Sequence, residues 1–69
     1  MFVSLLIITG FVNIGSVDYI SNGYVAIEYV KNSEIHYIDI SLSDARCQPE
    51  EGGAVIFDQD KIIKCFHKL

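Results

Sequence analysis

The chain is poor in the residues that would indicate a helical, disordered or disulfide-rich protein. Its 69 residues include one proline, no tryptophan and two cysteines, and charged residues make up 20%. Disorder needs low hydrophobicity and high charge, so 51% apolar residues exclude a disordered chain. No stretch of ten residues carries apolar side chains at helical spacing, which excludes long amphipathic helices. This length predicts one domain, residues 1–69.

Cationic residues are scarce too, because five lysines and arginines stand against nine acids, for a formal net charge of −4. Dense lysine and arginine carry most affinity for phosphate, so a general affinity for nucleic acid or anionic membranes is not expected. The apolar run at residues 1–8 is too short to span a bilayer and lacks the basic start and cleavage site of a signal peptide. We therefore expect a cytoplasmic protein with no membrane association, and interpret this run as a first strand serving an interface.

Two cysteines, Cys47 and Cys65, are too few for a disulfide framework or a four-ligand zinc site. Isolated cysteines are usually small buried hydrophobic residues, and that is the state we expect. A disulfide is the alternative, because Cys47 would begin the last loop and Cys65 would lie on the final strand. Such a bond would be disfavoured in a reducing cytosol.

β-Branched residues, by contrast, are abundant, with eleven isoleucines and six valines against four leucines. These side chains favour strands. Alternating apolar and polar residues, bounded by turn residues, predict five strands, over residues 3–20, 24–30, 34–42, 54–57 and 61–67. Asn22-Gly23 is a strong hairpin signal. Gly10 and Gly15 predict a bulge or bend in the first strand, and residues 43–46 predict one short helical turn capped by Ser43.

Five short strands joined by hairpins indicate an all-β fold, a small five-stranded antiparallel barrel that is OB-like, with an SH3-like barrel as the alternative. A chain of this size buries roughly 60% of its unfolded surface. Apolar burial then contributes on the order of 100 kcal/mol, and ordering the chain costs about the same. Because the balance is close to zero, we expect a homo-oligomer.

Groups that could carry out catalysis are missing from the pattern. An active site needs a nucleophile or metal, a base and an orienting group, and neither the two histidines nor the cysteines form such a set in the sequence. We expect no enzyme activity, no cofactor and no metal. Tyrosines are the exception, because Tyr19, Tyr24, Tyr29 and Tyr37 fall on the first three strands, where OB-fold proteins stack bases. The alternative is that these tyrosines are ordinary half-buried strand residues.

Three segments resemble the cold-shock domain, an OB-fold barrel that binds single-stranded RNA or DNA. Residues 22–27, Asn-Gly-Tyr-Val-Ala-Ile, stand where that family has Lys-Gly-Phe/Tyr-Gly-Phe-Ile. Residues 36–41, His-Tyr-Ile-Asp-Ile-Ser, stand where that family has its Val-Phe-Val-His-Phe/Ile-Ser strand, and residues 51–57, Glu-Gly-Gly-Ala-Val-Ile-Phe, are similar to its Glu-Gly-x-x-Val-x-Phe. The resemblance covers roughly residues 10–67. It implies base stacking by Tyr24 and Tyr37, with Tyr19 in place of the family's strand-one tryptophan.

The chain departs from the family's binding motif at three positions. Asn22 replaces the leading lysine, Ala26 the second aromatic residue, and Asp39 the histidine of the third strand. We expect Asp39 to repel phosphate, and Lys61 and Lys64 to supply what phosphate contact there is.

Two functions follow as hypotheses. The first is a small non-catalytic binding module, cold-shock-like, with weak affinity for single-stranded nucleic acid through Tyr19, Tyr24, Tyr37, Lys61 and Lys64. The alternative is a self-assembling or protein-interaction barrel with no nucleic-acid role, in which Phe2, Val3, Leu5, Leu6 and Ile7 form an intersubunit strand or patch.

Overall fold

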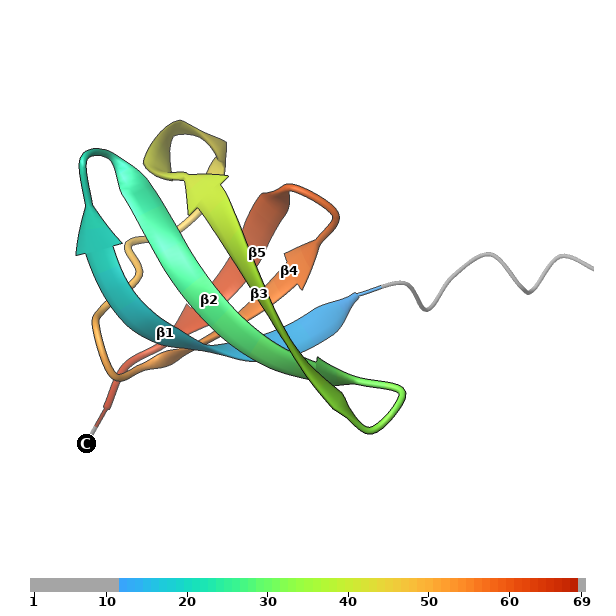
Figure 1. Ribbon diagram of the computed structural model, residues 1–69. Helices are drawn as coiled ribbons and strands as arrows, with labels where there is room; N and C mark the ends of the chain where they lie inside the picture. The colour runs from blue at the N-terminus through green and yellow to red at the C-terminus, as the bar shows by residue number, and fades with distance from the viewer. Residues whose placement is uncertain (1–11, 69) are drawn as a thin grey trace, which may run out of the picture.

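The computed structural model describes residues 12–68, which form one five-stranded antiparallel sheet (Figure 1). Its strands are β1 (Asn13–Ser21), β2 (Tyr24–Lys31), β3 (Glu34–Ser41), β4 (Ala54–Asp58) and β5 (Lys61–Phe66). A short 3₁₀ helix, η2 (Leu42–Asp44), follows β3. Four of the five predicted strands agree with these bounds to within one residue. Of the first predicted strand, residues 3–11 lie outside the described part, as does the proposed intersubunit segment.

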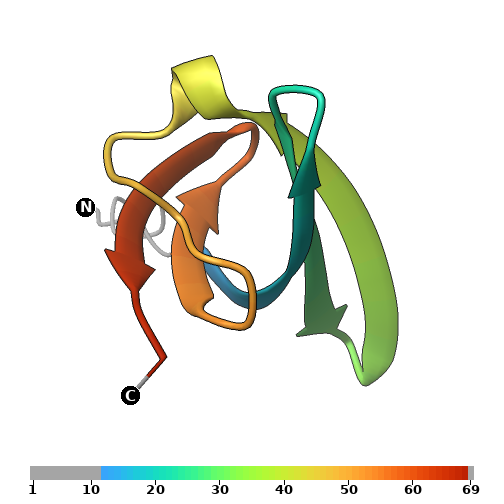
Figure 2. The ribbon, with the colours of Figure 1, turned by 90° about the vertical axis from the view of Figure 1, so that its left-hand side faces the viewer.

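The strand order is β3-β2-β1-β4-β5, so β1 joins a three-stranded meander to a returning hairpin. The sheet curls into a small, loose OB-like barrel that is not closed. β3 and β5 remain the two edges of the sheet, and η2 lies between them (Figure 2). One parallel bridge, Ala45 to Ile62, draws the edges together at that end, where the Arg46 amide donates to the Ile62 carbonyl at 2.9 Å.

Tight turns set the register of the first two hairpins. Asn22 and Gly23 have φ angles of 52° and 79°, and Asn32 and Ser33 have 53° and 66°. Two consecutive residues with positive φ give the turn whose twist matches that of paired antiparallel strands. The Asn-Gly prediction is therefore confirmed, and the register carries Tyr24 opposite Ser41 and Glu28 opposite Tyr37.

The core lies inside the curled sheet and is built by period-two alternation. On β2, Val25, Ile27 and Tyr29 point inward, while Tyr24, Ala26 and Glu28 alternate with them. Seven residues form the buried cluster: Val17, Val25, Ile27, Ile40, Val55, Phe57 and Ile62. They come from all five strands, so no single hairpin has a core of its own.

The irregularity in β1 is not at a glycine. Register shifts between Val17 and Tyr19, which places the bulge at Asp18. Gly15 instead lies in regular pairing between Tyr29 on one side and Val55 on the other. The bulge predicted at Gly15 is therefore absent there, and this glycine instead allows close packing. Gly10 lies outside the described residues.

The helical turn after β3 is one residue earlier than predicted. Its cap is Ser41, whose hydroxyl accepts a hydrogen bond from the Ser43 amide at 3.2 Å. Ser43 is thus inside the turn, and the prediction that it caps is wrong. The Leu42 amide donates to the Gly23 carbonyl at 2.8 Å, which ties this turn to the β1–β2 hairpin.

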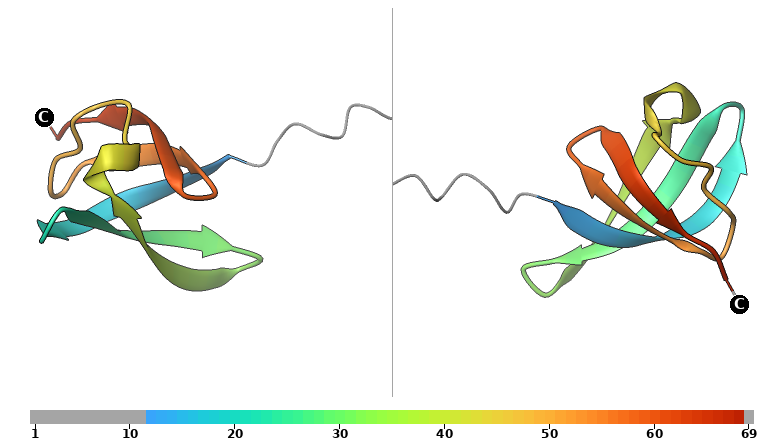
Figure 3. Two further views of the ribbon diagram at one scale, coloured as in Figure 1. Left: turned by 90° about the horizontal axis from the view of Figure 1, so that it is seen from above. Right: turned by 180° about the vertical axis from the view of Figure 1, so that it is seen from behind.

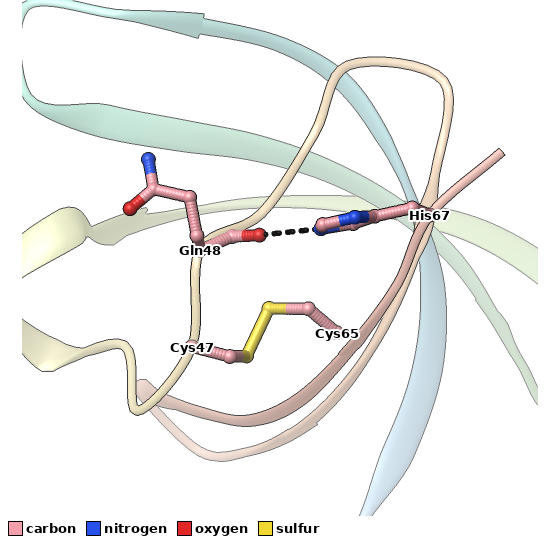
Figure 4. The surroundings of a disulfide bond; sticks show 4 residues. All are labelled: Cys47, Gln48, Cys65 and His67. Carbon is pink, nitrogen blue, oxygen red and sulfur yellow. Dashed lines mark hydrogen bonds between the residues drawn. A yellow bond between two sulfur atoms is a disulfide. The ribbon is translucent and has the colours of Figure 1, made fainter.

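A disulfide joins the last loop to β5, so the expectation of unpaired cysteines is wrong and the alternative holds. Cys47 and Cys65 bond with their Cα atoms 5.9 Å apart (Figure 4). Beside the disulfide, the His67 ring donates through Nε2 to the Gln48 carbonyl at 2.9 Å. The Lys68 amide donates to Glu50 Oε1 at 3.0 Å. These contacts attach residues 47–50 to the C-terminal end of β5.

Candidate functional site

The outer face of β1, β2 and β3 carries the residues that the sequence predicts to bind a ligand. Strand pairing sets them in cross-strand rows. Tyr19 pairs with Ala26, and Ala26 pairs with Asp39; one step away, Ser21 pairs with Tyr24. In the other direction Glu28 lies beside Tyr37. Alternation places Tyr24 and Tyr37 on one surface, and the bulge at Asp18 turns Tyr19 to the same side, although Tyr19 is only two residues after the buried Val17. We call this surface the tyrosine face.

The tyrosines of this face are open to solvent. Tyr19 is 56% exposed, Tyr24 53% and Tyr37 70%. Tyr29, which points to the other face of β2, behaves differently: its ring stacks on His36 at 5.5 Å and meets the Phe57 ring edge-on at 5.0 Å. Tyr29 is therefore a packing residue, whereas the three outer rings have free surface for stacking.

A hollow of about 220 Å³ opens in the tyrosine face beside the β1–β2 turn. Its lining residues are Tyr19, Ser21, Asn22, Tyr24, Ala26 and Asp39. Ala26 is buried and presents only a methyl group, whereas its neighbours on β1 and β3, Tyr19 and Asp39, carry larger side chains. The hollow lies over Ala26, between these larger side chains. The hollow thus combines aromatic walls with a carboxylate, an amide and a hydroxyl.

The charge on this face is negative. Asp39 and Glu28 belong to its rows, and Asp18 stands exposed on the adjoining bulge. Across residues 12–68, the sole ion pair joins Glu34 and His36, at 3.7 Å. The acids of the tyrosine face are therefore not neutralised by a neighbouring base within the described chain.

The two predicted phosphate-binding lysines lie on β5, which is not paired with β1, β2 or β3 in the sheet. Lys61 pairs with Asp58 in the β4–β5 register, and the Lys64 ammonium lies 5.8 Å from the centre of the Phe66 ring. Neither Lys61 nor Lys64 lines the hollow beside Tyr19 and Tyr24.

A second group on the outer face is aliphatic. Ile14, Val30 and Ile35 are 69%, 66% and 58% exposed. Val30 pairs with Ile35, and Ile14 pairs with Ile56 on β4. We call these four residues the aliphatic row. Because the solvated face of an antiparallel sheet is normally polar, this row is an unusual exposed surface.

The opposite end of the barrel has a hollow of its own, of about 310 Å³, between the β2–β3 and β4–β5 turns. Both turns and the start of β1 lie at this end in two views (Figures 1 and 3). Its lining is Asn13, Tyr29, Lys31, Ile38, Phe57 and Gln59. In the described residues no three His, Cys, Asp or Glu side chains are grouped to hold a metal ion. Nor does that part of the chain contain a helix long and apolar enough to cross a membrane.

Comparison of the chain with protein-family models, curated proteins and solved structures found no match. The resemblance to the cold-shock domain therefore stays a prediction, carried by the three segments described above.

Sequence reasoning named Tyr19 and Tyr24 as binding residues, and Asn22, Ala26 and Asp39 as departures from the binding motif, but it did not predict that they line one hollow. Ser21 completes the lining and was not singled out. The period-two pattern places Ala26 on the side of Tyr24, and Asp39 on the side of Tyr37. It cannot place Ala26 beside Asp39, because that neighbourhood depends on the β2–β3 register.

Proposed function

We propose that this protein is a small non-catalytic binding module that holds single-stranded nucleic acid on its tyrosine face. The observation that carries the proposal is the grouping of Tyr19, Tyr24 and Tyr37 on one surface, each more than half exposed. Bases stack on exposed aromatic rings irrespective of sequence, and each such contact contributes about 1–3 kcal/mol. OB-like barrels use this face of their strands for oligonucleotides.

The test replaces Tyr24 and Tyr37 by alanine together. Two stacking contacts would be lost, so affinity for a mixed-sequence single-stranded RNA should fall at least about thirtyfold. Because both side chains are exposed, the free energy of unfolding should change by less than about 1 kcal/mol. Fluorescence anisotropy with a labelled oligonucleotide gives the affinity, and urea titration gives the stability.

A matched control removes apolar area from the same sheet face without touching the tyrosines. Val30→Ala with Ile35→Ala should leave oligonucleotide affinity within about twofold of the parent protein. If the tyrosine double variant binds as well as the parent, base stacking is not the mode of binding.

The charge distribution makes a second, independent prediction about salt. Lys61 and Lys64 are the only phosphate-binding residues assigned, so at most two phosphates would be neutralised. For single strands the slope of log K against log salt is about −0.7 per phosphate, so the slope should be no steeper than about −1.4. Anisotropy titrations across a series of potassium chloride concentrations measure it. A much steeper slope would mean that phosphate contacts, and not stacking, dominate binding.

The aliphatic row favours one other function, self-assembly or protein interaction. Ile14, Val30 and Ile35 present exposed β-branched side chains on adjacent strands. Surfaces of this kind usually mark contacts between proteins. Tyr37 lies in the cross-strand row next to Val30 and Ile35, so assembly through the aliphatic row would bring the partner close to Tyr37 and leave Tyr19 and Tyr24, at the other end of the face, open.

A further inference from the structure

We infer that the hollow in the tyrosine face selects guanine, with the Asp39 carboxylate accepting hydrogen bonds from the base. This inference rests on the proposed function and adds a base preference to it. It starts from two residues that depart from the cold-shock pattern, Ala26 and Asp39. In the folded chain they are direct partners in the β2–β3 register, and both line the same hollow.

Ala26, which replaces an aromatic residue of the cold-shock motif, leaves space for a ligand ring. Ala26 is buried to 9% exposure with only a methyl group, between Tyr19 on β1 and Asp39 on β3. The hollow measures about 220 Å³. A protein cavity of about 150 Å³ already admits benzene, so this hollow can admit the ring system of a base. An aromatic side chain at position 26 would occupy that space.

Asp39, which replaces the histidine of the cold-shock motif, provides a hydrogen-bond acceptor. Asp39 is exposed and forms no ion pair or side-chain hydrogen bond within residues 12–68. An ionised carboxylate only accepts hydrogen bonds, and it does so at two oxygens side by side. It therefore fits a ligand edge that presents two adjacent donors.

Guanine is the one common base with such an edge, because its N1–H and its 2-amino group lie next to each other. In cytosine and adenine the amino group is flanked by an unprotonated ring nitrogen, which would face the second carboxylate oxygen. In uracil the single N3–H stands between two carbonyls. A carboxylate in the hollow therefore favours guanine, and repels the acceptor edges of the other bases.

Tyr19 and Tyr24 would hold the guanine ring by stacking, while Asn22 and Ser21 supply polar groups at the turn. The Asp39 carboxylate, which repels phosphate, would then select the base by accepting its hydrogen bonds. Good two-bond contacts to a base discriminate by about tenfold or more.

The experiment compares three nine-residue RNAs, uridine throughout or with guanosine or inosine at the centre. Inosine keeps N1–H but lacks the 2-amino group. We expect the guanosine strand to bind about tenfold more tightly than the all-uridine strand, with the inosine strand between them. Anisotropy at constant salt gives all three affinities.

Asp39→Asn should abolish the preference, because the amide offers one acceptor and one donor in place of two acceptors. The side chain is exposed and the change is nearly isosteric, so the fold should be retained. Asp18→Asn is the matched control: it removes the same charge from the neighbouring bulge, and should strengthen binding of all strands equally without changing their ratio.

The outcomes separate the two proposals. Binding of all three strands with equal affinity, or a guanosine preference that survives Asp39→Asn, overturns the guanine site but not the tyrosine face. Failure of every strand to bind overturns the proposed function itself.

Discussion

At the scale of single residues, two glycines show how the same residue type serves different physical needs. Gly15 is buried where β1 has neighbours on both sides, and a Cβ atom there would collide with Ile27 Cγ2 and lie 3.0 Å from the Glu28 carbonyl oxygen. Gly23 has open space around it, but its φ angle of +79° is one that side-chain-bearing residues rarely adopt. The first glycine is needed for packing and the second for backbone conformation.

Substitution of each glycine by alanine should therefore have a different size of effect. We expect Gly15→Ala to lower the free energy of unfolding by about 2 kcal/mol or more, because both strands next to β1 must move. Gly23→Ala should lower it by about 1 kcal/mol, the usual penalty for a left-handed residue with a side chain. Urea denaturation followed by circular dichroism measures both. Equal effects would contradict this distinction.

Individual side chains also show which parts of the site were predictable. Tyr24 and Tyr37 could be named from sequence because both fall in strand segments that resemble the cold-shock motif. The role inferred for Asp39 could not be named, since on sequence alone an acid on a binding face only repels phosphate. Its neighbours Ala26 and Tyr19 change that interpretation, and they are neighbours only through strand register.

At the scale of elements, the loop between η2 and β4 depends on contacts at both of its ends. The Gly52 amide donates to the Val17 carbonyl, and the Val17 amide donates to the Gly53 carbonyl, each at 2.9 Å. Glu51 accepts a hydrogen bond from the Ile20 amide at 2.9 Å. The end of this loop, just before β4 begins, thus pairs with β1 at Val17, next to the bulge (Figure 3). At its other end the Cys47–Cys65 disulfide holds it to β5.

Loss of this disulfide should destabilise the protein. The bond closes a loop with a sequence separation of 18, for which the chain-entropy model gives roughly 3 kcal/mol of stabilisation. Urea titrations with and without dithiothreitol measure the difference, and the double variant Cys47→Ala, Cys65→Ala should match the reduced protein. An unchanged unfolding midpoint on reduction would contradict this expectation.

The disulfide also bears on the compartment. Disulfides persist mainly in oxidising compartments, whereas the cytoplasmic location expected from sequence would favour free thiols. Thiol titration with Ellman's reagent, on denatured protein prepared without reductant from its natural source, would decide between an oxidising compartment and the cytoplasm. Two thiols per chain would support a cytoplasmic location, and none would oppose it.

At the scale of the whole molecule, the loose barrel leaves two kinds of surface for association. β3 and β5 are edge strands, joined by one bridge at the Ala45 end. The aliphatic row crosses β1–β4 on the outer face. Small domains bury a limited fraction of their surface, and association is one way to gain stability.

We expect a homo-oligomer that depends on the aliphatic row. Val30→Thr with Ile35→Thr keeps β-branched side chains, and so strand preference, while reducing apolar area. Light scattering should show a lower mass for this variant than for the parent protein. Tyr19→Thr, at the other end of the face, serves as the control and should leave the mass unchanged. A parent protein that is monomeric at all concentrations would contradict the expectation.

The sequence alone determined the fold class, because its information is local. β-Branched residues in period two, together with Asn-Gly and other turn residues, specify strands and hairpins without reference to distant parts of the chain. Alternation also assigns Tyr24 and Tyr37 to the face opposite the core, whereas Tyr19 reaches that face only through the bulge at Asp18.

Only the tertiary structure decided which residues become neighbours across strands. The Cys47–Cys65 bond, the bulge at Asp18 and the pairing of Ala26 with Asp39 all depend on strand order and register. Those are set when side chains from all five strands pack into one core. Long-range packing of this kind leaves no signal within a single strand.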